Sequence, residues 1–238
     1  MAKESAGANS RDIQHSAKPR TIAIDGPSGV GKSTIGRLLA DRYGYLFFDT
    51  GVLYRALALK AIEKNVDPTD EEALANIASS MRVDVLPSPA TSHSMYKVIV
   101  DGSDVTDRLR SSEVENIVSI VSAHPKVRQS LLEHQRRIAK SGPSVVVGRD
   151  IGTVVLPDAQ LKIYLDAAPE ERANRRYREL LSRGVNTTYE QVLMDIHRRD
   201  KLDSSRAASP LRVPKDAVVI DTTGKNIQEV LAEVEHWM

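Results

Sequence analysis

The chain has 238 residues, of which 41% are apolar and 27% are charged, and these proportions exclude collagen-like, coiled-coil and wholly disordered chains. Lysine and arginine (33) nearly cancel aspartate and glutamate (32), so the net charge of +1 gives no general attraction for nucleic acid, and any anion site has to be local. Cysteine is absent, which excludes disulfides and cysteine nucleophiles and suits a reducing compartment.

The first 19 residues are predicted to be a flexible tail, because they are polar and lack the apolar stretch of a signal peptide. No apolar run approaches the roughly 20 residues that would span a bilayer. We therefore expect a soluble, cytoplasmic protein that binds neither membrane nor nucleic acid. Nothing in the sequence demands more than a monomer.

A strand, a glycine-rich loop and a helix are predicted at the start of the folded part. Thr21–Asp25 is a short β-branched run that leads into glycines, and the helical stripe that follows is ended by Gly44. Tyr45–Phe48 predicts a second buried strand. Similar runs follow at 145–147, 161–165 and 217–220. Strands that alternate with helices predict a parallel sheet covered on both faces.

The later helices carry start signals. Pro125 stands where a first helical turn tolerates proline. Thr187-x-x-Glu190 and Asn226-x-x-Glu229 predict capping boxes for the last two helices.

The chain between Met81 and Thr106 differs in pattern, with short runs of alternating apolar and polar residues that are interrupted by prolines. We expect a small antiparallel insert there, with a turn at Asp101-Gly102. The predicted division is a core of residues 20–80 and 121–238, with an insert of residues 81–120.

The residues between the first strand and the first helix fit the phosphate-binding pattern of Gly, four residues, Gly, Lys and Ser. Glycines let backbone N–H groups surround an anion, and the helix N-terminus adds partial positive charge. Lys32 is expected to reach the β- and γ-phosphates of a nucleoside triphosphate, and the Ser33 hydroxyl to bind Mg²⁺. The predicted ATP-binding residues are Gly26, Pro27, Ser28, Gly29, Val30, Gly31, Lys32, Ser33 and Thr34.

Three classes of protein use such a loop: switch GTPases, motor or nucleic-acid ATPases, and kinases of small acceptors. The GTPase class needs Asn-Lys-x-Asp, which is absent, and an Asp-x-x-Gly after a central strand. The two matches, 41–44 and 221–224, are badly placed for that role. A nucleic-acid ATPase usually shows a strand ending in an acidic pair or a basic face, and neither is present.

A small-acceptor kinase needs further cations for the acceptor phosphate. Asp49 and Arg55 follow the second strand, near the carboxyl edge where open sheets bind ligands, and Arg149-Asp150 leaves the third strand at the same edge. A later helix would carry Arg199, Asp203 and Arg206 on one face. The alternative is a solvated helix face and a structural ion pair.

Five segments together resemble bacterial cytidylate kinase: GPSGVGKST, DTGVLYRA, VSAHPKVRQSLLEHQR, VVVGRDIGTVVLPDA and RRDKLDSSRAASPLRVPKDAVVIDTT. The resemblance runs from about Thr21 to Trp237. It implies an α/β fold with the three-layer core of P-loop NTPases, a mainly parallel sheet, an acceptor-binding insert and a helical lid. It also implies a nucleoside monophosphate kinase that transfers the γ-phosphoryl group of ATP to CMP or dCMP with Mg²⁺.

The resemblance assigns roles by motif position. Ser119, Arg128 and Asp150 would read cytosine, and Asp203 would hold the ribose. The acceptor phosphate would be held by Arg55, Arg149, Arg199 and Arg206, and Thr50 is also assigned to the CMP site. Catalysis of phosphoryl transfer requires that the substrates are positioned and that the developing charge is stabilised. We assign these roles to Lys32, Mg²⁺ and the arginines.

The arginine-rich stretch 170–183 is the predicted lid, spanning about residues 169–186. Arg172 and Arg176, one helical turn apart, are expected to close over the phosphates and exclude water. The six histidines lack metal-binding spacing. One departure stands out: the family commonly has an acidic residue just before Gly-Arg-Asp, and this chain has Val147.

The acceptor identity stays open at this level. A kinase of UMP, AMP or a hydroxylated metabolite is the alternative within the same chemistry. A nucleotide-dependent switch or nucleic-acid ATPase is the alternative from another class.

Overall fold

The computed structural model describes residues 18–87, 96–206 and 208–238. The predicted tail therefore lies outside the described residues, apart from its last two positions.

The core is a five-stranded parallel sheet in the order β2-β6-β1-β7-β8. The strands are β1 (Thr21–Asp25), β2 (Leu46–Asp49), β6 (Ser144–Val147), β7 (Leu161–Asp166) and β8 (Val218–Asp221). This confirms the predicted parallel sheet, with the ends of four strands moved by one residue. The central position of β1 places its carboxyl end in the middle of the sheet edge.

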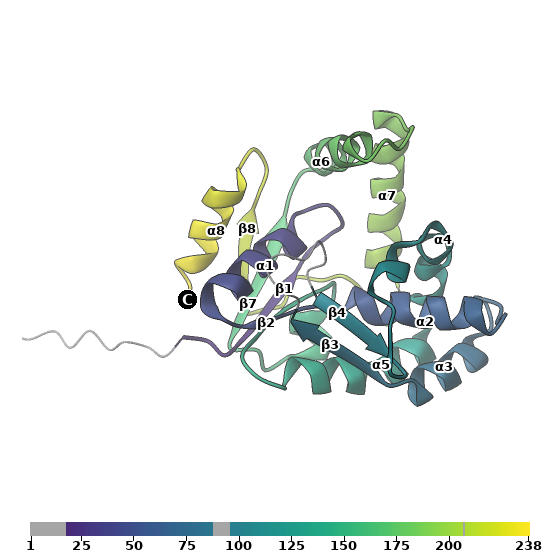
Figure 1. The fold of residues 1–238 in the computed structure, drawn as a ribbon. Coiled ribbons are helices and arrows are strands. Elements are labelled where there is room, and N and C mark those ends of the chain that lie inside the picture. The colour runs from purple at the N-terminus through teal and green to yellow at the C-terminus, as the bar shows by residue number, and fades with distance from the viewer. Residues whose placement is uncertain (1–17, 88–95, 207) are drawn as a thin grey trace, which may run out of the picture.

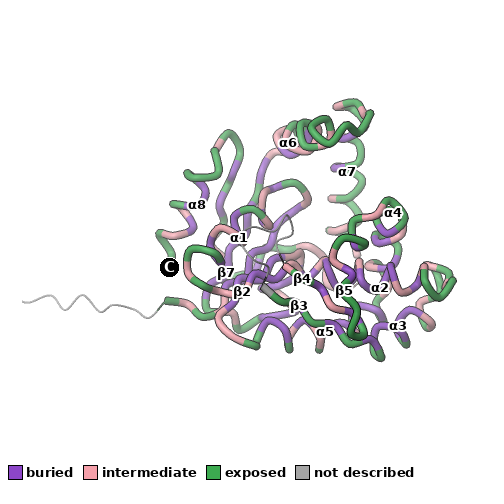
Figure 2. The backbone as a smooth tube through the Cα atoms, viewed as in Figure 1, coloured by how far each residue is buried: buried purple, intermediate pink, exposed green. Residues whose placement is uncertain are grey.

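Helices cover both faces of the sheet (Figure 1). Helices α1 (Lys32–Tyr43) and α8 (Ile227–Glu235) pack on one face, and α2 (Gly51–Glu63), α3 (Glu71–Ser80) and α5 (Pro125–Ala139) pack on the other. Figure 2 shows buried backbone running through the sheet between them. The result is the predicted three-layer α/β core.

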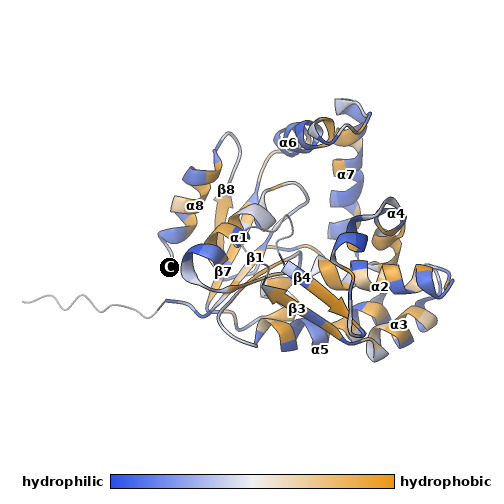
Figure 3. Ribbon diagram, in the orientation of Figure 1, coloured by the Kyte–Doolittle hydropathy of each residue, from blue (hydrophilic) through white to orange (hydrophobic). Residues whose placement is uncertain are grey.

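Strand residues alternate between the two layers, because successive side chains point to opposite faces. Phe47 and Val147 join the cluster under α1, while Phe48 and Val146 join the cluster under α2 and α5. Both faces are apolar, as the orange strands of Figure 3 show.

The insert between α3 and α4 contains the predicted antiparallel sheet. Its strands are β3 (Val83–Pro87), β4 (Tyr96–Val100) and β5 (Ser103–Asp104), followed by a short 3₁₀ helix, η1 (Thr106–Arg110), and α4 (Ser112–Val121). Asp101 and Gly102 both have positive φ, as a tight hairpin turn requires. The insert shares one hydrophobic cluster with α2, α3 and α5, and its boundaries at 81 and 120 stay a prediction.

Helices α6 (Pro169–Ser182) and α7 (Tyr189–Ser205) project from the body of the molecule (Figure 1). They pack on each other through a small separate cluster around Ala173, Val192 and Ile196. A helix pair with its own small core can move relative to a larger body.

The capping box of α7 lies one residue later than expected. Thr188, and not Thr187, accepts the N–H of Gln191, and the Gln191 side chain accepts the N–H of Thr188. Thr188 is the last residue with extended backbone, the conformation that an N-cap needs. The other two start signals, Pro125 and Asn226-x-x-Glu229, are confirmed.

Among the described residues, no helix combines the length and the apolar character needed to cross a membrane.

Candidate active site

One large pocket opens at the carboxyl edge of the parallel sheet, with a cavity volume of about 1250 Å³. Its lining comes from the loop after β1, from the residues that follow β2 and β6, and from α2, α4, α6, α7 and the start of α8. This volume exceeds the range of roughly 300–1,000 Å³ typical of a site for one small ligand. The pocket has room for two ligands side by side.

The phosphate-binding loop follows β1 and opens α1, as the sequence predicts. Gly26 has φ 147°, and a Cβ there would stand 2.1 Å from the carbonyl oxygen of Leu165. Gly31 has φ 98° at the N-cap of α1. Side chains at these positions would be strained or would clash, so the glycines are required by the backbone path.

The Lys32 side chain lies buried inside the loop, where Nζ donates to the carbonyl oxygens of Gly26 (2.7 Å) and Pro27 (2.6 Å). Burial lowers the pKa of this ammonium well below its ordinary value, and the nearby Arg149 guanidinium adds to the effect. A bound anion would reverse that effect, because opposite charge favours the charged form of lysine.

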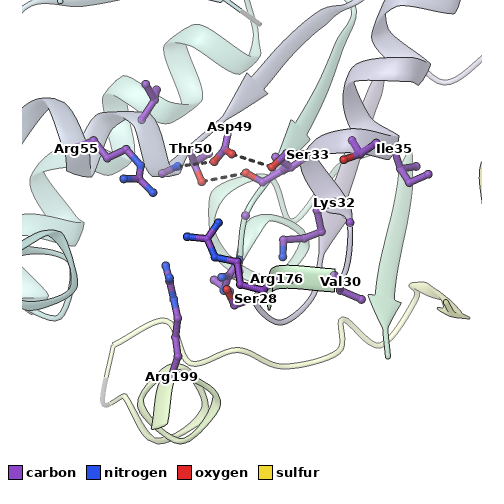
Figure 4. A pocket seen from close by; sticks show the side chains of 18 of the residues that line it. Ser28, Val30, Lys32, Ser33, Ile35, Asp49, Thr50, Arg55, Arg176 and Arg199 are labelled. Carbon is purple, nitrogen blue, oxygen red and sulfur yellow. Dashed lines mark hydrogen bonds between the residues drawn. The ribbon is translucent and has the colours of Figure 1, made fainter. Parts of the chain in front are cut away.

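Ser33 follows Lys32, and its Oγ donates to Oδ2 of Asp49 at 3.0 Å (Figure 4). Hydroxyl and carboxylate oxygens are ligands that suit Mg²⁺. No cluster of three or more histidine, cysteine or acidic side chains that could cage a metal occurs in the described parts of the chain.

A buried ion pair lies at the other side of the pocket. Arg128 Nη2 donates to Oδ2 of Asp150 at 2.7 Å, and both side chains are less than a tenth exposed. The Arg128 guanidinium also lies 5.3 Å from the centre of the Tyr54 ring. Ser119 stands on the exposed side of α4 and lines the same pocket. The three residues expected to read the base are thus brought to one pocket.

A second charged group joins β6 to the end of α7. Arg149 Nε donates to Oδ2 of Asp203 at 2.7 Å, and Arg206 Nη2 stands 3.4 Å from Oδ1 of the same carboxylate. Burial opposes ionisation of Asp203, but the two arginines outweigh it and lower its pKa. The Nε and Nη2 atoms of Arg206 are buried and have no hydrogen-bond partner among the described residues. Such donors are suited to an anionic ligand.

Arg55 from α2 and Arg199 from α7 extend into the same space from different elements (Figure 4). Arg55 forms an ion pair with Glu115 of α4. Thr50 is buried, and its hydroxyl donates to the carbonyl oxygen of Val147 at 3.2 Å. Arg55 can turn to a ligand by leaving Glu115, whereas Thr50 is occupied in joining β2 to β6.

The two lid arginines have different surroundings. Arg176 lines the pocket, and the one hydrogen bond of its guanidinium among the described residues goes to the exposed Glu179 on its own helix. Arg172 is buried and donates two hydrogen bonds to Asp200 of α7 and one to the carbonyl oxygen of Ser28. In this structure Arg172 ties α6 to α7 and to the phosphate-binding loop. That both arginines close over bound phosphates stays a prediction.

Asp25 at the end of β1 was not among the predicted site residues. Its carboxylate is fully buried and accepts the N–H groups of Ile151 and Gly152, both at 2.7 Å. These amides belong to η2 (Ile151–Val155), a short π-helical turn directly after Arg149-Asp150. Asp25 therefore fixes the segment that presents Arg149 and Asp150. An acidic residue between a buried strand and a glycine loop was the available signal.

Replacing Asp25 with asparagine should change the pH dependence of stability. Burial raises the pKa of Asp25 from 3.8 to about 6, in spite of its two amide hydrogen bonds. Between these values the folded protein holds a proton that the unfolded chain has lost, so stability falls as pH rises. Wild type should lose about 1.4 kcal/mol of unfolding free energy relative to the variant between pH 5 and pH 8. Urea unfolding at both pH values measures this, and parallel pH profiles for the two proteins would contradict it.

Comparison with known proteins is consistent with this site. The family model described as cytidylate kinase matches residues 22–238. A cytidylate kinase of Herpetosiphon aurantiacus is 49% identical over 216 residues, covering 91% of this chain and 93% of the relative. Cytidylate kinases of Bacillus subtilis (45% identical, 91% and 95% covered) and Roseiflexus castenholzii (48%, 91% and 92%) are similarly close. By both measures, the chain belongs to the cytidylate kinase family.

Proposed function

We propose that this protein transfers the γ-phosphoryl group of ATP to CMP and dCMP. Family membership makes the chain a phosphotransferase that acts on nucleotides and uses ATP. The observation that carries the assignment of the site is the shared pocket, in which the phosphate-binding loop faces Arg55, Arg149, Arg199 and Arg206. A donor and an acceptor phosphate both need such cations, and one pocket supplies both sets.

Loop residues 26–34, which include Lys32, form the part of the pocket that would bind ATP, the phosphoryl donor. The backbone amides at the start of α1 favour negative charge, and the Lys32 ammonium can leave the loop carbonyls for the β- and γ-phosphates. Ser33 would hold Mg²⁺, which supplies neutralising charge between the phosphates. Metal binding is supported here by the Ser33 hydroxyl oxygen and by the Asp49 carboxylate that accepts its hydrogen bond.

Base selection would come from Asp150, Arg128 and Ser119. Cytosine presents an exocyclic amino donor, for which a carboxylate is the natural acceptor. Uracil presents a carbonyl oxygen at that position, so it would lose the bond and also meet a like charge. The ion pair with Arg128 holds the Asp150 carboxylate in place. Arg128 has planar donors suited to the base carbonyl, and the Ser119 hydroxyl can donate or accept.

The acceptor phosphate would be held by Arg55, Arg149, Arg199 and Arg206, with Asp203 on the ribose. The buried Nε of Arg206, which has no hydrogen-bond partner among the described residues, supports this assignment. No general base is needed, because the acceptor oxygen of a monophosphate is already largely deprotonated near neutral pH. Catalysis then consists of alignment and of charge stabilisation by Lys32, Mg²⁺ and these arginines.

Arg176→Ala tests the lid. Loss of the Arg176 guanidinium should lower kcat by about 100-fold, because this group would stabilise the negative charge that develops during phosphoryl transfer. ATP affinity should change by less than about threefold, since the loop makes the ground-state contacts. Steady-state kinetics and ATP titration measure the two quantities. Arg178→Ala is the matched control, because Arg178 is exposed on the same helix and does not line the pocket. Equal losses in kcat and in ATP affinity would contradict a lid role.

An ADP-release assay across CMP, dCMP, UMP, AMP and single-stranded RNA tests the proposed activity. We expect turnover with CMP and dCMP above the other acceptors. Stimulation by RNA with none by monophosphates would reject the proposal in favour of a nucleic-acid ATPase. Cytoplasmic location and a monomeric state stay predictions.

A further inference from the structure

Strand β6 ends directly before Gly148, Arg149 and Asp150, and its last position carries no acidic side chain. Val147 stands there, and its side chain is 1% exposed in the cluster under α1. A Cβ on Gly36 of α1 would come within 2.7 Å of its Cγ1 atom. The first turns of α1 therefore press directly on Val147, and this position offers no oxygen to a metal or its waters.

The neighbouring strand supplies a carboxylate at the same level. Asp49 of β2 is paired in register with Val147 of β6. Paired residues of parallel strands point to the same face, and Phe47, two residues before Asp49, packs in the cluster under α1. Asp49 therefore projects on the α1 side of the sheet. Because β2 is an edge strand, this side chain lies beside the start of α1 and not beneath it.

Asp49 is held in one orientation by its two hydrogen bonds. Its Oδ1 accepts the N–H of Gly51 at 3.0 Å, and its Oδ2 accepts the Ser33 hydroxyl at 3.0 Å (Figure 4). The residue is half-buried and lines the pocket. The Ser33 proton is thereby directed to Asp49, which leaves the oxygen lone pairs free to face a metal.

Four of the five other carboxylates that line the pocket are paired with arginine, and the fifth, Asp107 of η1, forms no ion pair with a described residue. Among the described residues Glu115, Asp150, Glu179 and Asp203 each form an ion pair with arginine. Asp25 is bound to two backbone amides on the other face of the sheet. Asp49 forms no ion pair with any described residue, and its hydrogen bond to the Ser33 hydroxyl distinguishes it from Asp107.

We propose that Asp49 serves as the outer carboxylate of a Mg²⁺ site at Ser33. It orients the Ser33 hydroxyl and accepts hydrogen bonds from metal-bound water, and it adds the negative charge that Val147 cannot supply. It is a positioning residue and not a direct ligand. The inference rests on the proposed function only in that Ser33 holds Mg²⁺ when MgATP binds.

The test compares ATP affinity with Mg²⁺ and with EDTA, by calorimetry on the full chain. Wild type should bind ATP more tightly with Mg²⁺. Asp49→Asn should reduce this Mg²⁺-dependent gain by about tenfold, in line with the loss of an outer partner of a metal ligand. Its affinity in EDTA should be unchanged or higher, because a negative charge near the phosphates is gone. The asparagine keeps an acceptor for the Gly51 N–H, and the thermal midpoint checks that the variant folds.

Two further variants separate the outcomes. Asp107→Asn makes the same chemical change at another aspartate that lines the pocket, and it should keep the full Mg²⁺ gain. Ser33→Ala should lose the gain. If Ser33→Ala loses it and Asp49→Asn does not, the role of Asp49 is overturned and the proposed function stands. If both variants keep the Mg²⁺-dependent gain in ATP affinity, the Mg²⁺ site at Ser33 and the role of Asp49 are both contradicted.

Discussion

Replacing Lys32 with methionine should lower kcat for CMP phosphorylation by about 10³-fold, the upper range for removal of one preorganised charge donor. Lys32 is the buried cation at the centre of the phosphate-binding loop. The low-polarity surroundings that lower its pKa also strengthen its attraction for transferring phosphate. Methionine has a similar length and no charge, so it removes the electrostatic contribution with little change in packing.

A coupled ADP-release assay at saturating ATP and CMP measures this effect. Lys140→Met is the control, because Lys140 is an exposed residue at the end of α5, and it should keep wild-type kcat. A loss confined to the KM for ATP, with kcat unchanged, would show that Lys32 only binds substrate and would contradict its assigned role.

Asp150→Asn should narrow the preference for CMP over UMP by about 1–3 kcal/mol, which is roughly 5- to 150-fold in the ratio of kcat/KM values. The amide removes the charge that would repel the uracil carbonyl, and it can donate to that oxygen. The change also weakens the buried pair with Arg128. Breaking such a pair costs about 3–5 kcal/mol of stability, so the assay has to be made well below the thermal midpoint of the variant.

Asp203→Asn is the matched control for base selection. It makes the same chemical change in the same pocket, at the residue assigned to the ribose, and it should weaken CMP and UMP alike. If Asp150→Asn leaves the CMP to UMP ratio as it is in wild type, base recognition has to be moved to another part of the pocket.

The order of strands and helices and the phosphate-binding loop were predictable, because both depend on contiguous residues. An apolar run, its glycines and the helix that follows specify the loop without help from distant segments. The capping box of α7 shows the limit of local signals. Thr187 and Thr188 each have a suitable partner three residues later, Glu190 and Gln191. The path of the backbone selects the second pair.

The site residues divide in the same way. The sequence could nominate Arg172 and Arg176 together, because they are one helical turn apart. Only the packing of α6 against α7 places Asp200 beside the first and leaves the second facing the pocket. The importance of Asp25 was likewise hidden, since its partners lie 126 and 127 residues away.

By itself, the sequence determined the class of fold, the triphosphate-binding loop and, through five linked motifs, the family. Local backbone preferences and apolar periodicity are encoded within a few neighbouring residues, and these features depend on nothing else. The tertiary structure alone decided which charges meet: Asp49 with Ser33, Arg128 with Asp150, and Arg149 with Asp203. Such pairs depend on strand register and on the faces that helices present to each other, and these are fixed only when the whole core packs.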